Sequence, residues 1–559
     1  MLLPDEKLKP LLLQAGINEK TIDELSSFAK SARIPLQSAV VEKDILSDEM
    51  LGLIIADYFK FPFVVLSKIT IPEDVFRITP ERIARKYKIL SFAKDNESIK
   101  LAMADPKNTA ISEMIVKKTG LKVTPYFATE TDIENTLQIY RKALQQSFEE
   151  LLKDQLGKPS VEEDAPIAKI VDLLITDAYR DKASDIHIEP QEKESLVRFR
   201  IDGILHDVLH IDKKLHDRIA TRIKVISRLR TDEHLSAQDG KMRMLIDDEN
   251  LDLRVSIIPI ADGEKVVLRL LSSRSREYSL LDLGMNEGDL KKVTVAINKS
   301  YGMILSTGPT GSGKTTSIYA ILKILNTREK NITTIEDPVE YRIEGVNQIQ
   351  VNVKTNLTFA NGLRSILRQD PNVIFVGEIR DSETAGIAVN AALTGHLVLS
   401  TLHTNDAATA LPRLIDMQVE PFLVASTVNI IIGQRLVRKI CESCKVETSI
   451  KRSEVLKNIP EEIILKHFFN QKEDLNVFQG KGCKMCHHTG YAGRIGIFEV
   501  IGVSEKIRRL ITEKSNSDVI SRQAISEGMT TMLDDGLDKV AKGLTTAEEV
   551  IRVTKVESL

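Results

Sequence analysis

Apolar and polar positions follow several patterns along the chain, and the first of them indicates an N-terminal region of mixed structure. The first 60 residues carry apolar side chains at helical spacing, as at Ile22 and Leu25. Short β-type runs mixed with helical stretches follow, so we expect residues 1–140 to form a helical and α+β region. The charges, glycine and prolines of residues 141–166 are typical of an exposed linker.

Two further regions differ in how their predicted strands are patterned. Residues 167–275 begin with a helical stretch and continue with alternating runs such as SLVRFRID, with turns expected at Asp202-Gly203 and Asp262-Gly263. This pattern predicts an antiparallel α+β domain with helices on one face. Residues 283–440 instead alternate continuous apolar runs such as GMILST with helical segments, which predicts a mostly parallel sheet with crossover helices. The expected fold class is therefore α/β and multidomain.

The composition narrows the class of protein without identifying a function. The 559 residues suffice for several domains, and 77 basic against 80 acidic residues leave a net charge of −3. This balance argues against a protein that coats nucleic acid, so no direct nucleic-acid contact is expected. No apolar run approaches the ~18 residues that a membrane span needs, and the first residues lack a secretory signal, so we expect no membrane anchor.

A phosphate-binding loop is the clearest chemical signal in the sequence. Residues 308–315, GPTGSGKT, match the pattern G-x-x-x-x-G-K-[ST], with an apolar strand before it and an amphipathic helix after it. Lys314 would reach the β- and γ-phosphates of a nucleotide, and the Thr315 hydroxyl would complete a Mg²⁺ shell. The residues expected to bind nucleotide are Gly308, Pro309, Thr310, Gly311, Ser312, Gly313, Lys314, Thr315 and Thr316.

Two apolar strands of the predicted parallel sheet end in carboxylates. ITTIEDPVEY places Glu336 and Glu340 after one strand, and NVIFVGEIRD places Glu378 after the next. Because the carboxyl ends of parallel strands share one edge of a sheet, these acids predict hydrolysis of the nucleotide. Glu378 would hold the Mg²⁺ shell or orient water, and Glu336 or Glu340 would act as the base. Spacing alone does not divide these roles, and each acid could instead cap a helix.

Two histidines flank a further predicted strand. TGHLVLSTLHTND carries His396 and His403 at the two ends of a buried-type run, which should lie beside the phosphate strand. Either histidine could sense the γ-phosphate or link neighbouring subunits. A purely structural role is equally open for both.

All four cysteines occur in two Cys-x-x-Cys pairs, Cys441 with Cys444 and Cys483 with Cys486. Two such pairs supply the four thiolates of a tetrahedral structural Zn²⁺ site, so we expect a zinc-binding insertion over residues 441–490. A redox-active pair is the alternative, which the absence of a fifth cysteine disfavours. The remaining stretch, residues 491–559, is predicted to be mostly helical.

The ordered motifs resemble one known superfamily. GPTGSGKT, TIEDPVEY, ILRQDPNVIFVGEIRD and GHLVLSTLHTND resemble the Walker A, Asp box, Walker B and His box of the type II secretion and type IV pilus ATPases. ASDIHIEP, RFRIDG and LRVSIIP resemble the second N-terminal domain of that superfamily. GQRLVRKIC with the cysteine pairs is similar to its extension and secretion members, and not to the retraction ATPase. The resemblance implies a RecA-like P-loop domain that follows a PAS-like sheet domain, in a homohexameric ring.

The resemblance also implies partners and further site residues. ATP hydrolysis would drive assembly of pilins or pseudopilins through an inner-membrane platform protein and a cytoplasmic adaptor, at the cytoplasmic face of the membrane. Arg200, Arg254 and Arg269 match positions that reach the nucleotide when the sheet domain closes, although they could be ordinary strand arginines. A pilus-retraction or DNA-uptake motor and a catalytically weak, nucleotide-gated scaffold remain alternative functions.

The N-terminal region resembles a degenerate MshEN module, which in relatives binds cyclic di-GMP through glycine-containing repeats. In IPLQSAVVEKDIL, Gln37 stands where the repeat has glycine, and no glycine follows at the next turn. Because these glycines allow the backbone to approach the ligand closely, we do not expect cyclic di-GMP binding. We predict a docking module for the membrane platform instead.

Overall fold

The computed structural model describes residues 4–32, 35–43, 45–69, 71–95, 97–139, 148, 165–246, 249–271, 278–455, 459, 461–468 and 474–554. The chain forms two compact units, of which the first comprises Met1–Phe199 with His206–Leu268 and the second Arg200–Leu205 with Arg269–Leu559. The predicted linker, residues 141–166, lies almost wholly outside the described residues. Among the described residues, no helix has the length and apolar character needed to cross a bilayer.

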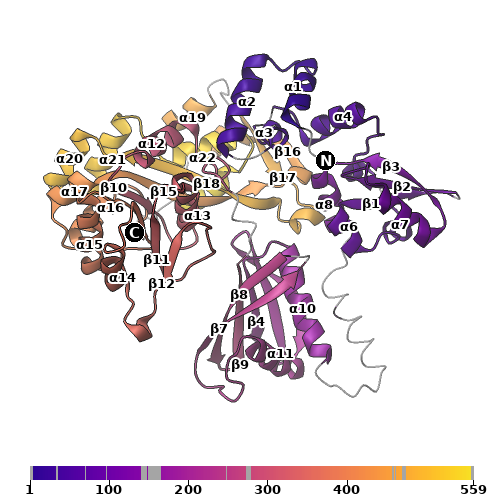
Figure 1. Ribbon diagram of the computed structural model, residues 1–559, viewed down its shortest axis with the longest axis horizontal. Coiled ribbons are helices and arrows are strands. Elements are labelled where there is room, and N and C mark those ends of the chain that lie inside the picture. Colours follow the sequence, from indigo (N-terminus) through magenta and orange to yellow (C-terminus); the bar gives the residue numbers. More distant parts are fainter. Residues whose placement is uncertain are drawn as a thin grey trace. The chain divides into compact units, whose positions relative to one another are not determined.

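The N-terminal part of the first unit consists of a helical segment and a small sheet (Figure 1). Helices α1 to α4 pack around a shared cluster of buried leucines, isoleucines and alanines, as their helical apolar spacing predicts. In the small sheet, β1 pairs antiparallel with β2, and β2 pairs parallel with β3. The elements are α1 (Asp5–Gln14), α2 (Glu19–Ala32), α3 (Leu36–Glu42), α4 (Asp48–Phe59), η1 (Leu66–Lys68), α5 (Glu73–Phe76), α6 (Glu81–Tyr87), β1 (Ile89–Lys94), β2 (Ser98–Met103), α7 (Thr109–Thr119), β3 (Lys122–Phe127) and α8 (Glu130–Ile139).

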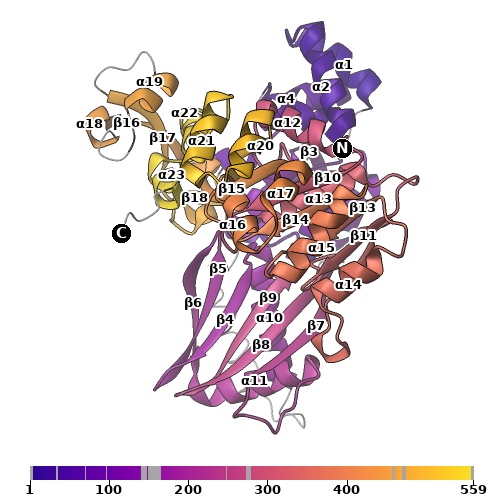
Figure 2. The ribbon, with the colours of Figure 1, turned by 90° about the vertical axis from the view of Figure 1, so that its left-hand side faces the viewer.

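A six-stranded sheet follows, in the order β6-β5-β4-β9-β8-β7, and its strands run side by side in Figure 2. Helix α10 packs against β4 and α11. The predicted Asp202-Gly203 turn is present, and both residues have a positive φ (49° and 88°), as a tight hairpin turn requires. The elements are α10 (Ala165–Arg180), β4 (Asp185–Pro190), β5 (Glu194–Ile201), β6 (Ile204–Asp212), α11 (Lys213–Ile226), β7 (Gln238–Ile246), β8 (Glu249–Ile260) and β9 (Gly263–Leu271).

The second unit is built on a seven-stranded sheet in the order β12-β11-β13-β14-β10-β15-β18. All neighbouring pairs are parallel except β15 with β18, so the predicted mostly parallel sheet is confirmed. The parallel strands β10, β11, β13 and β14 are buried along their whole length, which explains their continuous apolar runs. The strands are β10 (Gly302–Thr307), β11 (Ile332–Glu336), β12 (Asn347–Gln350), β13 (Val373–Val376), β14 (Leu397–Leu402), β15 (Val428–Ile440) and β18 (Tyr491–Gly502).

Helices cover both faces of this sheet. Side chains of α12 and α13 form one apolar cluster with Ile304 of β10. Side chains of α14 to α17, α20 and α21 form a second cluster with Met303 and Leu305, the neighbours of Ile304 on the same strand. The helices are α12 (Glu287–Ile297), α13 (Lys314–Leu325), α14 (Phe359–Ile366), α15 (Ser382–Leu393), α16 (Ala410–Asp416), α17 (Pro421–Thr427), α20 (Glu505–Thr512), α21 (Ser517–Ser526), α22 (Met532–Ala541) and α23 (Ala547–Thr554), with the 3₁₀ turn η3 (Val353–Thr355).

The cysteine-bearing insertion lies between β15 and β18. Its strands β16 and β17 form an antiparallel pair. Residues 491–559 are mostly helical, but β18, which was not predicted as a strand, first returns the chain to the large sheet beside β15. The elements of the insertion are η4 (Glu442–Cys444), β16 (Lys445–Lys451), α18 (Arg452–Val455), α19 (Glu461–His467), β17 (Asp474–Gly480) and η5 (Lys484–Cys486).

Candidate functional site

The predicted phosphate-binding loop connects the carboxyl end of β10 to the first residue of α13, Lys314. Gly308, Gly311 and Gly313 adopt positive φ values of 144°, 79° and 88°, which favour glycine. A Cβ added at Gly308 would lie 2.4 Å from the carbonyl oxygen of Gln434. The loop thus presents bare backbone at a helix N-terminus, which is the arrangement that binds phosphate groups.

Lys314 lies within this loop and is largely buried. Its Nζ donates to the carbonyl oxygens of Gly308 (2.7 Å) and Pro309 (3.0 Å). Burial lowers the pKa of Lys314, and the nearby Glu378 carboxylate opposes that shift. The ammonium group is therefore already curled over the loop, where nucleotide phosphates would replace the weaker carbonyl partners. Thr315 and Thr316 are half-buried in the first turn of α13.

Glu378 lies two residues beyond β13, and its side chain is 12% exposed. One carboxylate oxygen pairs with Nη2 of Arg380 at 2.5 Å, and the other lies 3.0 Å from Nε2 of His403. Because Val376 of β13 is in register with Ser400 of β14, Glu378 and His403 emerge at the same edge of the sheet. The structure thus brings Glu378, His403 and the environment of Lys314 together, as the motif order predicted.

Glu336 has a different environment from Glu378. It is 1% exposed, and its carboxylate accepts hydrogen bonds from the hydroxyl groups of Tyr319 and Thr334 and from the Gln348 amide (3.2 Å). Burial raises the pKa of Glu336, and these three donors only partly offset the rise. Glu340 is half-buried, and its backbone N–H donates to the Tyr319 hydroxyl at 3.4 Å. Tyr319 of α13 thus links Glu336 to the segment that carries Glu340.

The two histidines lie at opposite edges of the sheet. His396 precedes β14, and its carbonyl oxygen accepts from the N–H of Gly302, the first residue of β10. Its ring Nδ1 lies 3.0 Å from the carbonyl oxygen of Ala391. This is the amino edge of the parallel strands, whereas the phosphate-binding loop lies at the carboxyl edge. His396 therefore cannot sense the γ-phosphate bound by its own loop, while a structural or subunit-linking role stays open.

The three arginines that the resemblance singled out belong to the six-stranded sheet. Arg200 donates from Nη1 to the carbonyl oxygen of Gly203 at 3.0 Å. Arg254 and Arg269 alternate with buried residues along β8 and β9, so their side chains lie on the polar face of the sheet. Their contact with nucleotide stays a prediction.

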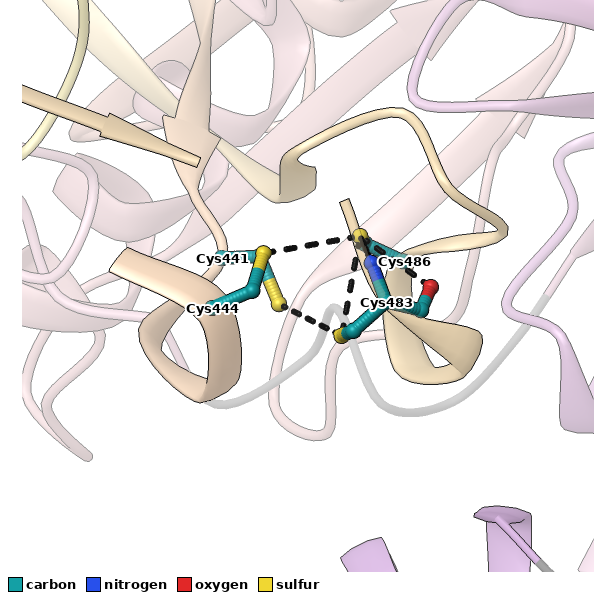
Figure 3. Close-up of side chains that lie close together, drawn as sticks. All are labelled: Cys441, Cys444, Cys483 and Cys486. Atoms are coloured by element: carbon teal, nitrogen blue, oxygen red, sulfur yellow. Dashed lines mark hydrogen bonds between the residues drawn. The ribbon is translucent and has the colours of Figure 1, made fainter. Parts of the chain in front are cut away.

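The four cysteines form one cluster, in which Cys441 and Cys444 from one turn face Cys483 and Cys486 from the other (Figure 3). The Sγ atoms are 3.8 Å apart for Cys441–Cys483, 3.9 Å for Cys444–Cys486 and 3.8 Å for Cys483–Cys486, and all four lie within 4.8 Å of one another. Sulfur atoms at tetrahedral corners with Zn–S bonds of about 2.3 Å would lie about 3.8 Å apart. The donor set therefore fits Zn²⁺ with no ligand position left open.

Backbone groups hold the thiols in place. The N–H of Cys441 donates to the carbonyl oxygen of Gly490 (2.9 Å), and the N–H groups of Cys483 and Gly490 lie 3.1 and 3.3 Å from Sγ of Cys486. Burial would raise the pKa of the Cys486 thiol, but these two donors and the side chains of Cys483 and Cys444 together outweigh it and lower the pKa to about 7. N–H donors of this kind stabilise a thiolate, the form that binds zinc.

A family model described as "Type II/IV secretion system protein" matches residues 160–552, and a model of the MshEN domain matches residues 59–146. The first match covers more than two thirds of the chain, including the phosphate-binding loop and the four cysteines. The chain belongs to the type II/IV secretion system protein family. The predicted superfamily is thereby confirmed, whereas the MshEN match leaves the prediction on cyclic di-GMP untested.

Relatives of this secretion-family chain carry names from two systems. A "Type IV pilus assembly ATPase PilB" of Myxococcus xanthus is 36% identical over 531 residues and covers 92% of each chain. Another of Pseudomonas aeruginosa is 37% identical in an alignment that covers 97% of this chain and 98% of the relative. A "Type II secretion system protein E" of P. aeruginosa is 46% identical over 397 residues, which cover 71% of this chain and 77% of the relative.

Among solved structures, the Legionella pneumophila ATPase DotB matches with a TM-score of 0.51 and 20% identity, covering 69% of this chain and 95% of that chain. At this identity the likeness shows the fold alone, and it confirms the predicted multidomain α/β class with a P-loop domain. Membership of the family and the geometry of the loop show that this secretion-family protein is an ATPase that uses ATP and Mg²⁺. The four-cysteine cluster has the ligand number and the spacing of a structural Zn²⁺ site.

Sequence reasoning missed two residues of this ATPase site. Arg380 pairs with Glu378. The sequence could have indicated this residue, because Arg380 and Glu378 stand in the same motif, GEIRD. Tyr319 joins Glu336 to Glu340 from the middle of α13, where its spacing is that of any buried helix residue. No sequence pattern distinguishes such a tyrosine from an ordinary core aromatic.

Proposed function

We propose that this ATPase is the motor that powers assembly of a type IV pilus, acting as a homohexameric ring on the cytoplasmic side of the membrane. The assembly role rests on how much of the chain the pilus-assembly relatives cover. The two pilus-assembly relatives cover 92% and 97% of the chain, including the N-terminal region, whereas the secretion relative covers 71%. The second candidate is the motor of type II secretion, which the higher identity of 46% over the shared part favours.

The chemistry proposed for the site follows from the environments of its acids. On binding ATP, Lys314 exchanges its two loop carbonyls for phosphate oxygens, and Thr315 contributes to the Mg²⁺ shell. Glu378, fixed by Arg380 and His403, holds that shell or orients the attacking water. Glu340 is the better candidate for the base, because the carboxylate of Glu336 is enclosed by three hydrogen-bond donors.

The coupling of hydrolysis to work is proposed to follow the family pattern. Arg200, Arg254 and Arg269 supply positive charge to the transition state when the sheet domain closes on the ATPase domain. An inner-membrane platform protein and a cytoplasmic adaptor receive the motion and transmit it to pilins. The intact Lys314 and Glu378 count against a nucleotide-gated scaffold, and the four-cysteine centre counts against a retraction motor.

The experiment that tests the proposed function is gene replacement. Deletion of the gene should abolish surface pili, wild-type protein should restore them, and Glu378→Gln should not, because this variant still binds ATP but cannot turn it over. Loss of secreted exoproteins with pili intact would assign the chain to type II secretion. Pili that persist and no longer retract would instead assign it to retraction.

A separate measurement tests the ring. ATPase activity per chain, with Mg²⁺ present, should rise with protein concentration and then saturate, because a site completed by neighbouring subunits works only in the oligomer. Activity that is measurable and independent of concentration would show that each chain is self-sufficient and would contradict the ring as the catalytic unit.

A further inference from the structure

A buried glutamine lies directly under the phosphate-binding loop. Gln434 belongs to the GQRLVRKIC motif, and its side chain is 0% exposed. The parallel register pairs Thr307 of β10 with Gly433 of β15, so the next residue on β15 lies beside Gly308, where the loop begins. The position of Gln434 follows from the pairing of β10 with β15 and does not depend on the sequence of the phosphate-binding loop.

Gln434 contacts both ends of the loop. Its carbonyl oxygen would lie 2.4 Å from a Cβ at Gly308, and its side-chain Nε2 would lie 2.8 Å from a Cβ at Gly313. Its Oε1 accepts a hydrogen bond of 2.7 Å from the hydroxyl of Ser317, which lies in the first turn of α13. One residue thus touches the start of the loop, its last glycine and the helix that follows.

The polar groups at this contact are not all satisfied. Nε2 of Gln434 and Oγ of Ser312 are both buried without a hydrogen-bond partner in the described part of the chain. Buried polar groups are nearly always paired in folded proteins, and an exception calls for an explanation, of which a functional role is one. An apolar side chain of the same volume would fill this space without the desolvation cost, so packing alone does not explain a glutamine here.

We propose that Gln434 is a positioning residue for the phosphate-binding loop. Its amide oxygen holds Ser317 and its amide nitrogen packs against Gly313, so that the loop N–H groups converge on the phosphates. Its free N–H is retained for the loop conformation that bound nucleotide imposes. The effect acts through the loop, so it should appear in nucleotide affinity. The inference requires only that the loop binds ATP, and it holds for a pilus or a secretion motor alike.

The test compares two amides on the same strand. Gln434→Met keeps the volume and removes both polar atoms, and we expect the Kd of Mg-ATP and the KM to rise about tenfold with kcat within about threefold. The control is Asn429→Leu, because Asn429 packs against Gly302 and bonds to Tyr301 at the opposite end of β10. This control should lower the Tm and leave the Kd unchanged.

A purely structural glutamine would behave differently. Misfolding lowers the fraction of active enzyme, and hence the apparent kcat, but it leaves the KM of the surviving molecules unchanged. An unchanged Kd in Gln434→Met, or equal rises in Gln434→Met and Asn429→Leu, would overturn the proposal. Should Gln434→Met fail to fold, Ser317→Ala decides, since it removes only the hydroxyl that fixes the amide. A raised Kd with an unchanged Tm would support positioning, and an unchanged Kd would overturn it.

Discussion

The phosphate-binding edge and the four-cysteine centre both gather side chains from distant parts of the chain, but they do so by different means. At the phosphate edge, β10, β13 and β14 end in register, so Lys314, Glu378 and His403 meet because of the sheet. At the cysteine centre, two short turns that follow β15 and precede β18 bring the thiols together. The first site is therefore formed by the core of the large sheet, whereas the second lies on two turns outside that sheet, where a bound metal ion would add stability.

This difference separates the energetics of the two regions. The strands of the phosphate edge are fully buried and pack against α12 to α17, so losing one functional side chain should leave their backbone unchanged. Strands β16 and β17 form a two-stranded antiparallel pair, and such pairs are marginal on their own. Variants at the phosphate edge should consequently change chemistry with little effect on stability, and variants at the cysteine centre should do the reverse.

The largest expected effect is that of Lys314→Ala. Removal of the ammonium group leaves the β- and γ-phosphates without their closest positive charge, so ATP turnover should fall by at least about 100-fold. The Tm should change by only a few degrees, because β10 and α13 on either side of the loop are packed in the core. A coupled ATPase assay and thermal unfolding measure both quantities, and Lys330→Ala, at an exposed lysine before β11, is the control. Turnover at the wild-type rate would contradict the assignment of the loop.

The parallel core was predictable because burial on both faces forces continuous apolar runs, and the loop and acid motifs mark the carboxyl ends of those runs. Strand β18 was missed although IGIFEVI is apolar. Its partner β15 is separated from it by the cysteine insertion. The helical pattern of the residues that follow β18 led to a helical prediction for the whole stretch from residue 491. When an insertion separates two antiparallel strands, the sequence around the second strand does not indicate which sheet it joins.

The division of roles among the acids could not be predicted, for a related reason. Glu336 and Glu378 look alike in sequence, since each follows an apolar strand. They differ in what other elements bring to them: Tyr319 and Gln348 enclose the first, whereas Arg380 and His403 leave the second at the sheet edge. Burial and partners of this kind arise from tertiary packing, which spacing does not encode.

An intermediate effect is expected at the cysteine centre. Cys441→Ser combined with Cys444→Ser should reduce bound zinc from about one ion per chain to none, because two thiolates cannot hold the ion at a structural site. The Tm should fall, while the Kd of Mg-ATP should stay within about threefold of the wild-type value, since β15 remains paired with β10. Elemental analysis and calorimetry test this, with Ser443→Ala as a control inside the same turn. A large loss of ATP binding would show that the two regions are coupled.

The smallest effect is expected for Glu336→Gln, which distinguishes a linking acid from a base. The amide can accept from Thr334 and Gln348 and donate to Tyr319, so we expect turnover within about threefold and a stability change of about 1 kcal/mol. Burial raises the pKa of Glu336 above its ordinary 4.5. The raised pKa of Glu336 therefore adds to the free energy of unfolding in full below pH 4.5, and this contribution is lost as the pH rises through the pKa of the folded state.

The glutamine variant should remove that part of the pH dependence, and urea unfolding between pH 4.5 and 8 measures it. Glu344→Gln, an exposed acid near by, should leave the profile unchanged. Loss of turnover by more than about 100-fold with ATP binding intact would make Glu336 the base. The enclosed carboxylate would then have to open during the cycle, so the phosphate edge would not be preformed by the core in the way that its contacts indicate.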